Sequence, residues 1–159
     1  MDGFKRNSFI LISLVLADQA LKWLIESLRP ELDLKLVTIH SIHNSGASFG
    51  MLQGQNTALI FISIIVLGIV MMNVKSISQK QTLPVTMITA GILGNLIDRA
   101  SRGFVVDFFD LGWFPAFNLA DSCISIGVAW LVIILLLEKD YEPRAKAGTI
   151  TPQKKRKKR

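Results

Sequence analysis

The sequence predicts an all-α integral membrane protein with four transmembrane helices and a small β-sheet in the first outer loop. Half of the 159 residues are hydrophobic. The mean hydropathy is +0.43, which is too apolar for an ordinary soluble domain of this length. A helix needs about 18 to 20 apolar residues to cross a bilayer. Four segments come close to this length or reach it: Phe9 to Ile25, Thr57 to Val74, Leu83 to Ile97 and Leu119 to Leu137.

The four segments differ in their polar content. The second carries no charge, and the fourth carries only Asp121. Asp18 and Lys22 interrupt the first, whereas Asp98 and Arg99 follow the third at once. The first and third segments therefore span a membrane only if these groups face protein or lie near the interface. We expect a single membrane-embedded domain over residues 1–159.

The first segment allows two interpretations. Lys5 and Arg6 precede an apolar run that ends in the small residues of VLAD, as in a secretory signal, and cleavage there would leave three spans. The apolar pattern continues to Ile25, which favours a retained helix. Asp18 and Lys22 share a helix face at a spacing of four. They could satisfy each other as a buried pair or help to shape a functional site.

Lys and Arg are unequally distributed among the loops, and this bias sets the orientation of a membrane protein. Thirteen lie in the N-terminus, the link between the second and third spans and the C-terminal end, against four in the other two loops. Both termini are therefore predicted to be cytoplasmic, with the loop 26–56 outside. We expect the tail 140–159, which ends in KKRKKR, to be disordered and to lie against anionic lipid rather than nucleic acid.

The outer loop contains a strand-like segment, DLKLVTIH, which predicts the small sheet. HNSGASFG follows it two residues later, and there Asn44 offers both a hydrogen-bond donor and an acceptor. His40 and His43 form an isolated HxxH, which we interpret as two loop histidines rather than a metal site. Cys123 is the only cysteine, so an intrachain disulfide is excluded.

The third segment carries a stripe of small and polar residues. Gly91, Gly94, Asn95 and Asp98 recur at spacings of three and four residues. Small residues let helices approach closely in a bilayer, and an asparagine can bond across the contact. A packing seam explains the two glycines fully, but it explains Asp98 less well.

The start of the fourth segment is the strongest indication of a functional site. Asn118, Asp121, Ser122 and Ser125 share one helix face. Either Asn118 or Asp121 alone could simply cap the helix, whose dipole favours a negative charge there. Asp107, however, precedes Asp121 by fourteen residues at another rim of an apolar stretch. Two carboxylates beside a bilayer indicate acid–base chemistry on a substrate within the membrane.

Five ordered blocks resemble the bacterial lipoprotein signal peptidase family, signal peptidase II. They are DQALKWL, HNSGASFG, GILGNLIDR, GFVVDFFD and FPAFNLADS, and with the spans they cover about residues 10–138. Ser48 and Cys123 fall where small residues vary. The resemblance implies an intramembrane aspartic endopeptidase that removes the signal peptide from a diacylglyceryl-modified prolipoprotein, on the amino side of the lipidated cysteine. It also implies a small periplasmic sheet beside the helices.

The resemblance further implies roles for individual residues. Asp107 and Asp121 match the catalytic dyad. The positions that support or line the site are Asp18, Lys22, Asn44, Gly94, Asn95, Asp98, Arg99, Asn118 and Ala120. By hypothesis, Asn118 orients Asp121, Arg99 holds substrate backbone or lipid phosphate, and Asn44 contacts the peptide. We expect a monomer in the inner membrane, with prolipoprotein and membrane lipid as partners, and no metal, other cofactor or nucleic acid.

Two other classes of protein remain open from the residues alone. A small four-helix transporter could couple proton movement to Asp18, Asp98 or Asp121, because intramembrane carboxylates serve that purpose too. A noncatalytic membrane subunit could hold the same residues as buried ion pairs. The long outer loop is unexplained by the transporter interpretation.

Overall fold

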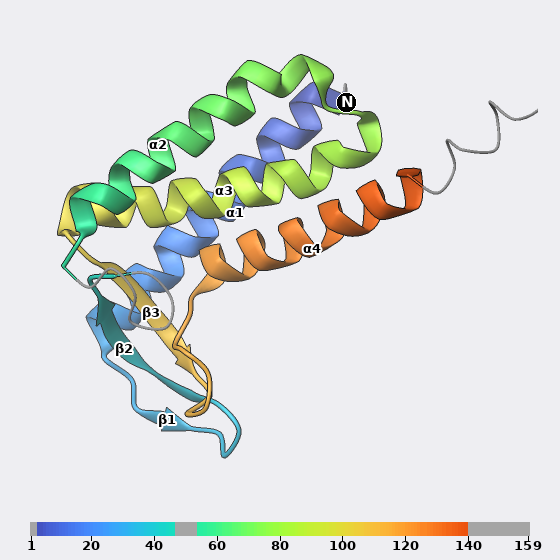
Figure 1. The fold of residues 1–159 in the computed structure, drawn as a ribbon. Coiled ribbons are helices and arrows are strands. Elements are labelled where there is room, and N and C mark those ends of the chain that lie inside the picture. The colour runs from blue at the N-terminus through green and yellow to red at the C-terminus, as the bar shows by residue number, and fades with distance from the viewer. Residues whose placement is uncertain (1–2, 47–53, 140–159) are drawn as a thin grey trace, which may run out of the picture.

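A helix lies over each of the four predicted segments (Figure 1). The computed structural model of the chain describes residues 3–46 and 54–139. The helices are α1 (Gly3–Leu28), α2 (Asn56–Asn73), α3 (Gln79–Arg102) and α4 (Leu119–Lys139), and the 3-10 turn η2 (Val74–Ser76) extends α2. The strands are β1 (Leu32–Asp33), β2 (Thr38–Asn44) and β3 (Val105–Asp110), in the sheet order β1-β2-β3.

Three helices in the described part of the chain are long and apolar enough to cross a membrane: Lys5–Leu28, Asn56–Ser76 and Leu119–Glu138. The helix α3 is less apolar, but it contacts each of the other three helices. Its polar residues Asn95 and Asp98 are buried. The polar content of α3 is therefore explained by its central position, where these side chains face protein.

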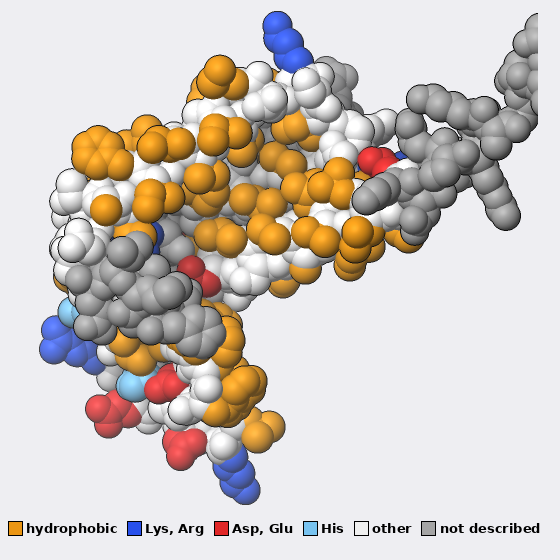
Figure 2. All heavy atoms as spheres, in the orientation of Figure 1, with side chains coloured by type: hydrophobic (Ala, Val, Ile, Leu, Met, Phe, Trp, Pro, Cys, Tyr) orange, Lys and Arg blue, Asp and Glu red, His pale blue; other side chains and the backbone are white. Residues whose placement is uncertain are grey.

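The distribution of side chains is the reverse of that in a soluble protein. Asp18, Lys22 and Asn118 are buried, whereas Phe61 and Met72 expose 61% and 86% of their surface. Figure 2 shows apolar side chains spread over the helices and many of the charged ones gathered at the sheet. Apolar helices that enclose polar groups suit a hydrocarbon solvent, in which each polar group needs a partner inside the protein.

Glycines permit a close contact between α3 and α4, as the sequence predicts. A Cβ atom added to Gly91 would clash with the carbonyl oxygen of Ala120. On the opposite helix, a Cβ atom on Gly127 would lie 2.8 Å from the carbonyl oxygen of Pro84. The predicted packing seam of α3 is confirmed, and Gly127 is a further member that the stripe analysis did not select.

The sheet differs from the prediction in two respects. The segment DLKLVTIH is not a single strand, because the chain reverses between β1 and β2. The Lys35 N–H donates to Asp33 Oδ1 at 2.8 Å, and Lys35 has a φ of 68°. An aspartate side chain that bonds to the backbone two residues later favours such a turn. The third strand, β3, pairs antiparallel with β2 but comes from the loop before α4. The sheet is therefore not confined to the first loop.

The sheet lies at one end of the helices (Figure 1). The N-terminal end of α1, the connection between α2 and α3, and the C-terminal end of α4 lie at the opposite end. Ser48 and the predicted disordered tail, residues 140–159, lie outside the described residues.

Candidate active site

The turn between β3 and α4 brings Asp107 beside the start of α4. The Phe117 N–H donates to the Phe109 carbonyl oxygen at 3.0 Å, and the Phe109 N–H donates back at 2.9 Å. In an antiparallel pair, the residue that precedes one bridged residue lies opposite the residue that follows the other bridged residue. The bridge between Phe109 and Phe117 therefore directs Asp107 towards Asn118 and the first turn of α4.

Asn118 bonds to both predicted catalytic aspartates. Its side-chain amide donates to Asp107 Oδ1 at 2.7 Å, and its backbone N–H donates to Asp121 Oδ2 at 3.2 Å. In return, the Asp121 N–H donates to Asn118 Oδ1 at 2.9 Å. These reciprocal bonds form a capping box at the N-terminus of α4. The helix-capping interpretation is therefore correct, and the same cap holds both carboxylates.

The remaining carboxylate oxygens accept bonds from two other asparagines. Asn44 Nδ2 donates to Asp107 Oδ2 at 2.8 Å, and Asn95 Nδ2 donates to Asp121 Oδ1 at 2.8 Å. In the β2–β3 register Ile42 lies opposite Asp107, so Asn44 is the diagonal neighbour on the same face. Each carboxylate oxygen can accept more than one hydrogen bond. Both acids therefore keep acceptor capacity for a water molecule or a substrate.

The environment of Asp107 favours its protonated form. Burial and then the nearby charge of Asp121 raise the pKa of Asp107 from 3.8 to about 6. Hydrogen bonds from Asn44 and Asn118 and the charge of Lys22 oppose this rise in pKa but do not cancel it. Two neighbouring carboxyl groups do not both ionise cheaply, so a pair of this kind holds one proton between its members over a range of pH.

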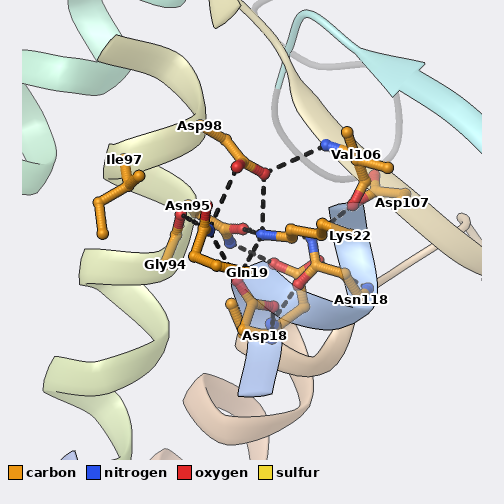
Figure 3. A network of polar contacts seen from close by, with 12 residues as sticks. Asp18, Gln19, Lys22, Gly94, Asn95, Ile97, Asp98, Val106, Asp107 and Asn118 are labelled. Atoms are coloured by element: carbon orange, nitrogen blue, oxygen red, sulfur yellow. Dashed lines mark hydrogen bonds and ion pairs between the residues drawn. The ribbon is translucent and has the colours of Figure 1, made fainter. Parts of the chain in front are cut away.

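Lys22 is the centre of a buried polar network that joins α1 to α3 (Figure 3). Its ammonium nitrogen lies 2.8 Å from Asp18 Oδ2, 2.9 Å from Asp98 Oδ2 and 3.0 Å from Asn95 Oδ1. An ammonium group has three N–H donors, and each has an acceptor here. Because Asn95 also bonds to Asp121, Lys22 fixes the amide group that orients this carboxylate.

The two partners of Lys22 also hold the backbone of neighbouring elements. Asp18 Oδ1 accepts a bond from the Ala120 N–H in the first turn of α4 at 2.9 Å. Asp98 Oδ2 accepts a bond from the Val106 N–H in β3 at 3.3 Å. The network thus joins α1, α3, α4 and β3. Asp18 and Lys22 therefore satisfy each other as a buried pair, and their contacts extend to the elements that carry Asp107 and Asp121.

Gln19 belongs to this network but was not selected from the sequence. Its amide nitrogen donates to Asp18 Oδ2 at 3.2 Å, to the Gly94 carbonyl oxygen at 3.1 Å and to Asp98 Oδ1 at 3.2 Å. The side chain therefore joins α1 to α3. A signal was present, because Gln19 lies within DQALKWL and three residues before Lys22, a spacing that shares a helix face.

Arg99 lies near the aspartates but bonds elsewhere. Its guanidinium donates to the Gly46 carbonyl oxygen at 3.1 Å, and its own carbonyl oxygen accepts a bond from Asn56 Nδ2 at 3.1 Å. Arg99 therefore joins α3 to the end of β2 and to the start of α2. Its charge acts on Asp121 and Asp107. Among the described residues, Arg99 Nε is buried without a hydrogen-bond partner.

The two histidines lie in strand β2, so the prediction of loop histidines was wrong about their position. His40 bonds with Asp110 at 3.1 Å, and His43 bonds with Glu26 at 3.0 Å. They therefore have different partners and do not converge. In the part of the chain that the structure describes, no group of three or more His, Cys, Asp or Glu side chains is arranged to hold a metal ion.

Gly94 gives a direct test of how tightly this network is packed. A Cβ atom at Gly94 would lie 2.6 Å from Asp18 Oδ2 and 3.2 Å from the Ala120 Cβ atom. We expect Gly94→Ala to lower the free energy of unfolding by about 1–3 kcal/mol, because the overpacked contact must shift. Thermal unfolding in detergent measures this effect. Gly68→Ala is the matched control, because no atom lies within 4 Å of its added Cβ. Equal unfolding of the two variants would contradict the tight contact.

A hollow of about 320 Å³ opens beside Asp121 at the N-terminal part of α4. It is lined by Phe114, Pro115, Ala116, Phe117, Asp121, Ser122, Ser125 and Ile126. Aromatic and aliphatic side chains form most of its wall, so the hollow suits an apolar group beside the Asp121 carboxylate.

Comparisons with known proteins show the family of the chain. The family described as signal peptidase (SPase) II matches residues 10–137. The lipoprotein signal peptidase of Syntrophomonas wolfei is 40% identical over 146 residues, which cover 87% of this chain and 96% of the relative. That of Dehalococcoides mccartyi is 38% identical and covers 77% of this chain and 83% of its own length.

Solved structures match as well. A structure described as a bacterial membrane enzyme has a TM-score of 0.79 and 31% identity, and it covers 94% of this chain and 95% of its own. A second, similarly described, has a TM-score of 0.75 and 33% identity, with 83% of this chain covered and 93% of its own. The transporter alternative finds no support in these matches. The chain belongs to the lipoprotein signal peptidase family of bacterial inner-membrane aspartic peptidases, which remove signal peptides from prolipoproteins.

Proposed function

We propose that Asp107 and Asp121 are the catalytic dyad of this peptidase and share one proton. The observation that carries the proposal is that buried Asn118 bonds to both carboxylates at once. One asparagine in contact with both acids fixes their relative position. Pre-organised geometry of this kind lowers the cost of bringing the reacting groups into line.

The environments of the two acids suggest how the roles divide. Asp121 is the ionised member, because it lies in the first turn of α4 and accepts bonds from Asn95 and from the Asn118 N–H. Asp107 is the protonated member, because burial and the charge of Asp121 raise its pKa to about 6. This division of roles follows the rule that neighbouring acids with different environments take opposite parts in catalysis.

The reaction then follows from these two protonation states. Asp121 takes a proton from a water molecule, whose oxygen attacks the scissile carbonyl carbon. Asp107 donates its proton to the carbonyl oxygen, so a neutral gem-diol forms without a covalent enzyme intermediate. The proton on Asp121 next passes to the departing amine as the C–N bond breaks. Asp107 recovers the proton of the collapsing hydroxyl, which restores the original pair.

The supporting residues act on the dyad through their contacts. Asn44 orients Asp107, and Lys22 orients Asp121 through Asn95. Arg99 balances the negative charge of the pair from a distance. The bond from Asn44 to Asp107 supports a positioning role, in place of the direct peptide contact expected from the sequence.

The substrate and the topology follow the family. The substrate is a prolipoprotein whose cysteine carries diacylglycerol, and the cut falls on the amino side of that cysteine. The four helices span the inner membrane with both termini in the cytoplasm, and the sheet and the dyad lie near the outer leaflet. Lys75 and Lys80 in the α2–α3 connection support this orientation. The apolar hollow beside Asp121 suits acyl or signal-peptide side chains.

The test is the cleavage of a diacylglyceryl-modified prolipoprotein by the purified full chain in the presence of a metal chelator. We expect two products whose masses place the cut immediately before the lipidated cysteine, at a rate that the chelator does not change. The same prolipoprotein without the lipid is the control and should be cleaved much more slowly. Loss of cleavage on chelation would contradict the proposed chemistry. A cut at another bond would contradict the proposed substrate.

A further inference from the structure

A second hollow, of about 330 Å³, lies at the end of the helices away from the candidate active site. Residues of α1, α2, η2 and α3 contribute to its lining, along with the short link that follows η2. Within the described residues, α1 and α2 both contact α3 but make no close backbone approach to each other. The hollow is therefore a groove between α1 and α2 with α3 as its floor. Figure 1 shows the N-terminal end of α1 beside the connection from α2 to α3.

The walls of this groove suit a hydrocarbon chain. The α2 side is apolar, with Val70, Met71 and Val74. The floor carries Thr86 and Thr89, whose hydroxyls donate to carbonyl oxygens of their own helix at 2.8 Å and 2.7 Å. A hydroxyl that already has an acceptor in its own helix does not require one from the ligand. The floor can therefore face an apolar ligand without leaving a buried donor unpaired.

Three exposed cations are close in sequence to the groove. Arg6, Lys75 and Lys80 each lie within two residues of a residue that lines it. From the α1 side, Asn7 and Ser8 add polar groups to the lining. Basic pockets between transmembrane helices attract the anionic headgroups of lipids. The groove thus combines an apolar channel with a positively charged rim at the same end of the molecule.

We propose that this groove binds one anionic phospholipid of the surrounding leaflet. One acyl chain lies between α1 and α2 on the floor of α3, and the phosphate headgroup contacts Arg6, Lys75 and Lys80. A helix from a second protein is the less suitable occupant, because an apolar membrane helix brings no anionic group to the exposed cations beside the groove.

The test is photo-crosslinking in bilayers. The full chain is reconstituted with phosphatidylglycerol that carries a diazirine in its acyl chain, or with phosphatidylcholine that carries the same chain. Crosslinked peptides are then mapped by mass spectrometry. We expect phosphatidylglycerol to label the groove segments of α1, α2 and α3 several times more strongly than phosphatidylcholine. Equal labelling by the two lipids, or an absence of lipid adducts on the groove segments, would overturn the proposal.

Matched variants test the groove and the rim separately. Val70→Trp fills the groove and should abolish its labelling, whereas Ile69→Trp on the neighbouring exposed face should not. Lys75→Gln with Lys80→Gln should reduce labelling by about fivefold for each lysine. The control pair Arg29→Gln and Lys35→Gln makes the same charge change at the sheet end and should leave it unchanged. Labelling that survives Val70→Trp, or that falls equally in both charge pairs, would overturn the proposal.

Discussion

Asp107→Asn and Asp121→Asn are each expected to lower kcat by between about a hundredfold and ten thousandfold, the range that general acid–base catalysis supplies. Asparagine keeps the shape of the side chain but can neither take a proton from water nor hold the shared one. The proposed mechanism needs one ionised and one protonated acid, so either change removes an essential group. Cleavage of the lipidated prolipoprotein by the purified variants measures the effect.

Asp110→Asn is the matched control for this prediction. Asp110 lies on the same strand as Asp107 but bonds to His40 and Gly112 rather than to the network around Asp121. Its substitution should change kcat by no more than a few-fold. All three variants should unfold at similar temperatures. If Asp107→Asn or Asp121→Asn kept near-normal cleavage while unfolding at the same temperature as the unaltered protein, the catalytic role of the pair would be refuted.

The second large effect is expected at Lys22, and it concerns stability. Lys22→Met leaves the carboxylates of Asp18 and Asp98 buried without their shared cation. Breaking a buried ion pair by removing one partner costs about 3–5 kcal/mol, because the remaining charges stay desolvated. We expect the free energy of unfolding to fall by this amount. Thermal and denaturant unfolding in detergent, followed by circular dichroism, measures the fall.

Two further variants separate this effect from a general loss of charge. Lys35→Met removes an exposed lysine in the turn between β1 and β2 and should change stability by about 0.5 kcal/mol or less. The triple variant Lys22→Met, Asp18→Asn, Asp98→Asn removes all three charges and should recover part of the loss, since neutral groups are cheaper to bury. If Lys22→Met were as stable as Lys35→Met, the network would not hold the helices together.

The helices and most residues of the candidate site could be selected from the sequence, because their signals are local. Long apolar runs marked the positions of the helices, and the three-and-four spacing on α3 marked its contact with α4. The cap formed by Asn118 and Asp121 was also visible, because a capping box depends on residues three apart. The extra turns of α3 at Gln79 and Arg102 were missed, because polar residues extend a helix without extending its apolar run.

The features that were missed depend on contacts between distant segments. Strand β3 was not predicted as a strand, because the residues of GFVVDFFD do not reveal that this segment pairs with β2. Gln19 bonds to residues 75 and 79 positions away, and a single side chain on α1 does not reveal such partners. The turn at Asp33 and Lys35 had a local signal, the aspartate, which the alternation of apolar residues in DLKLVTIH obscured.

The most direct test of a shared proton is the pH dependence of kcat/KM for the lipidated prolipoprotein, which reports ionisations of the free enzyme. Because the pKa of Asp107 is raised to about 6, this acid keeps its proton below that pH and loses it as the pH rises further. We predict a bell-shaped profile, with a fall on the alkaline side when both acids are ionised and on the acid side when both are protonated. A value of kcat/KM that stays constant or rises across the whole alkaline range would contradict the central claim.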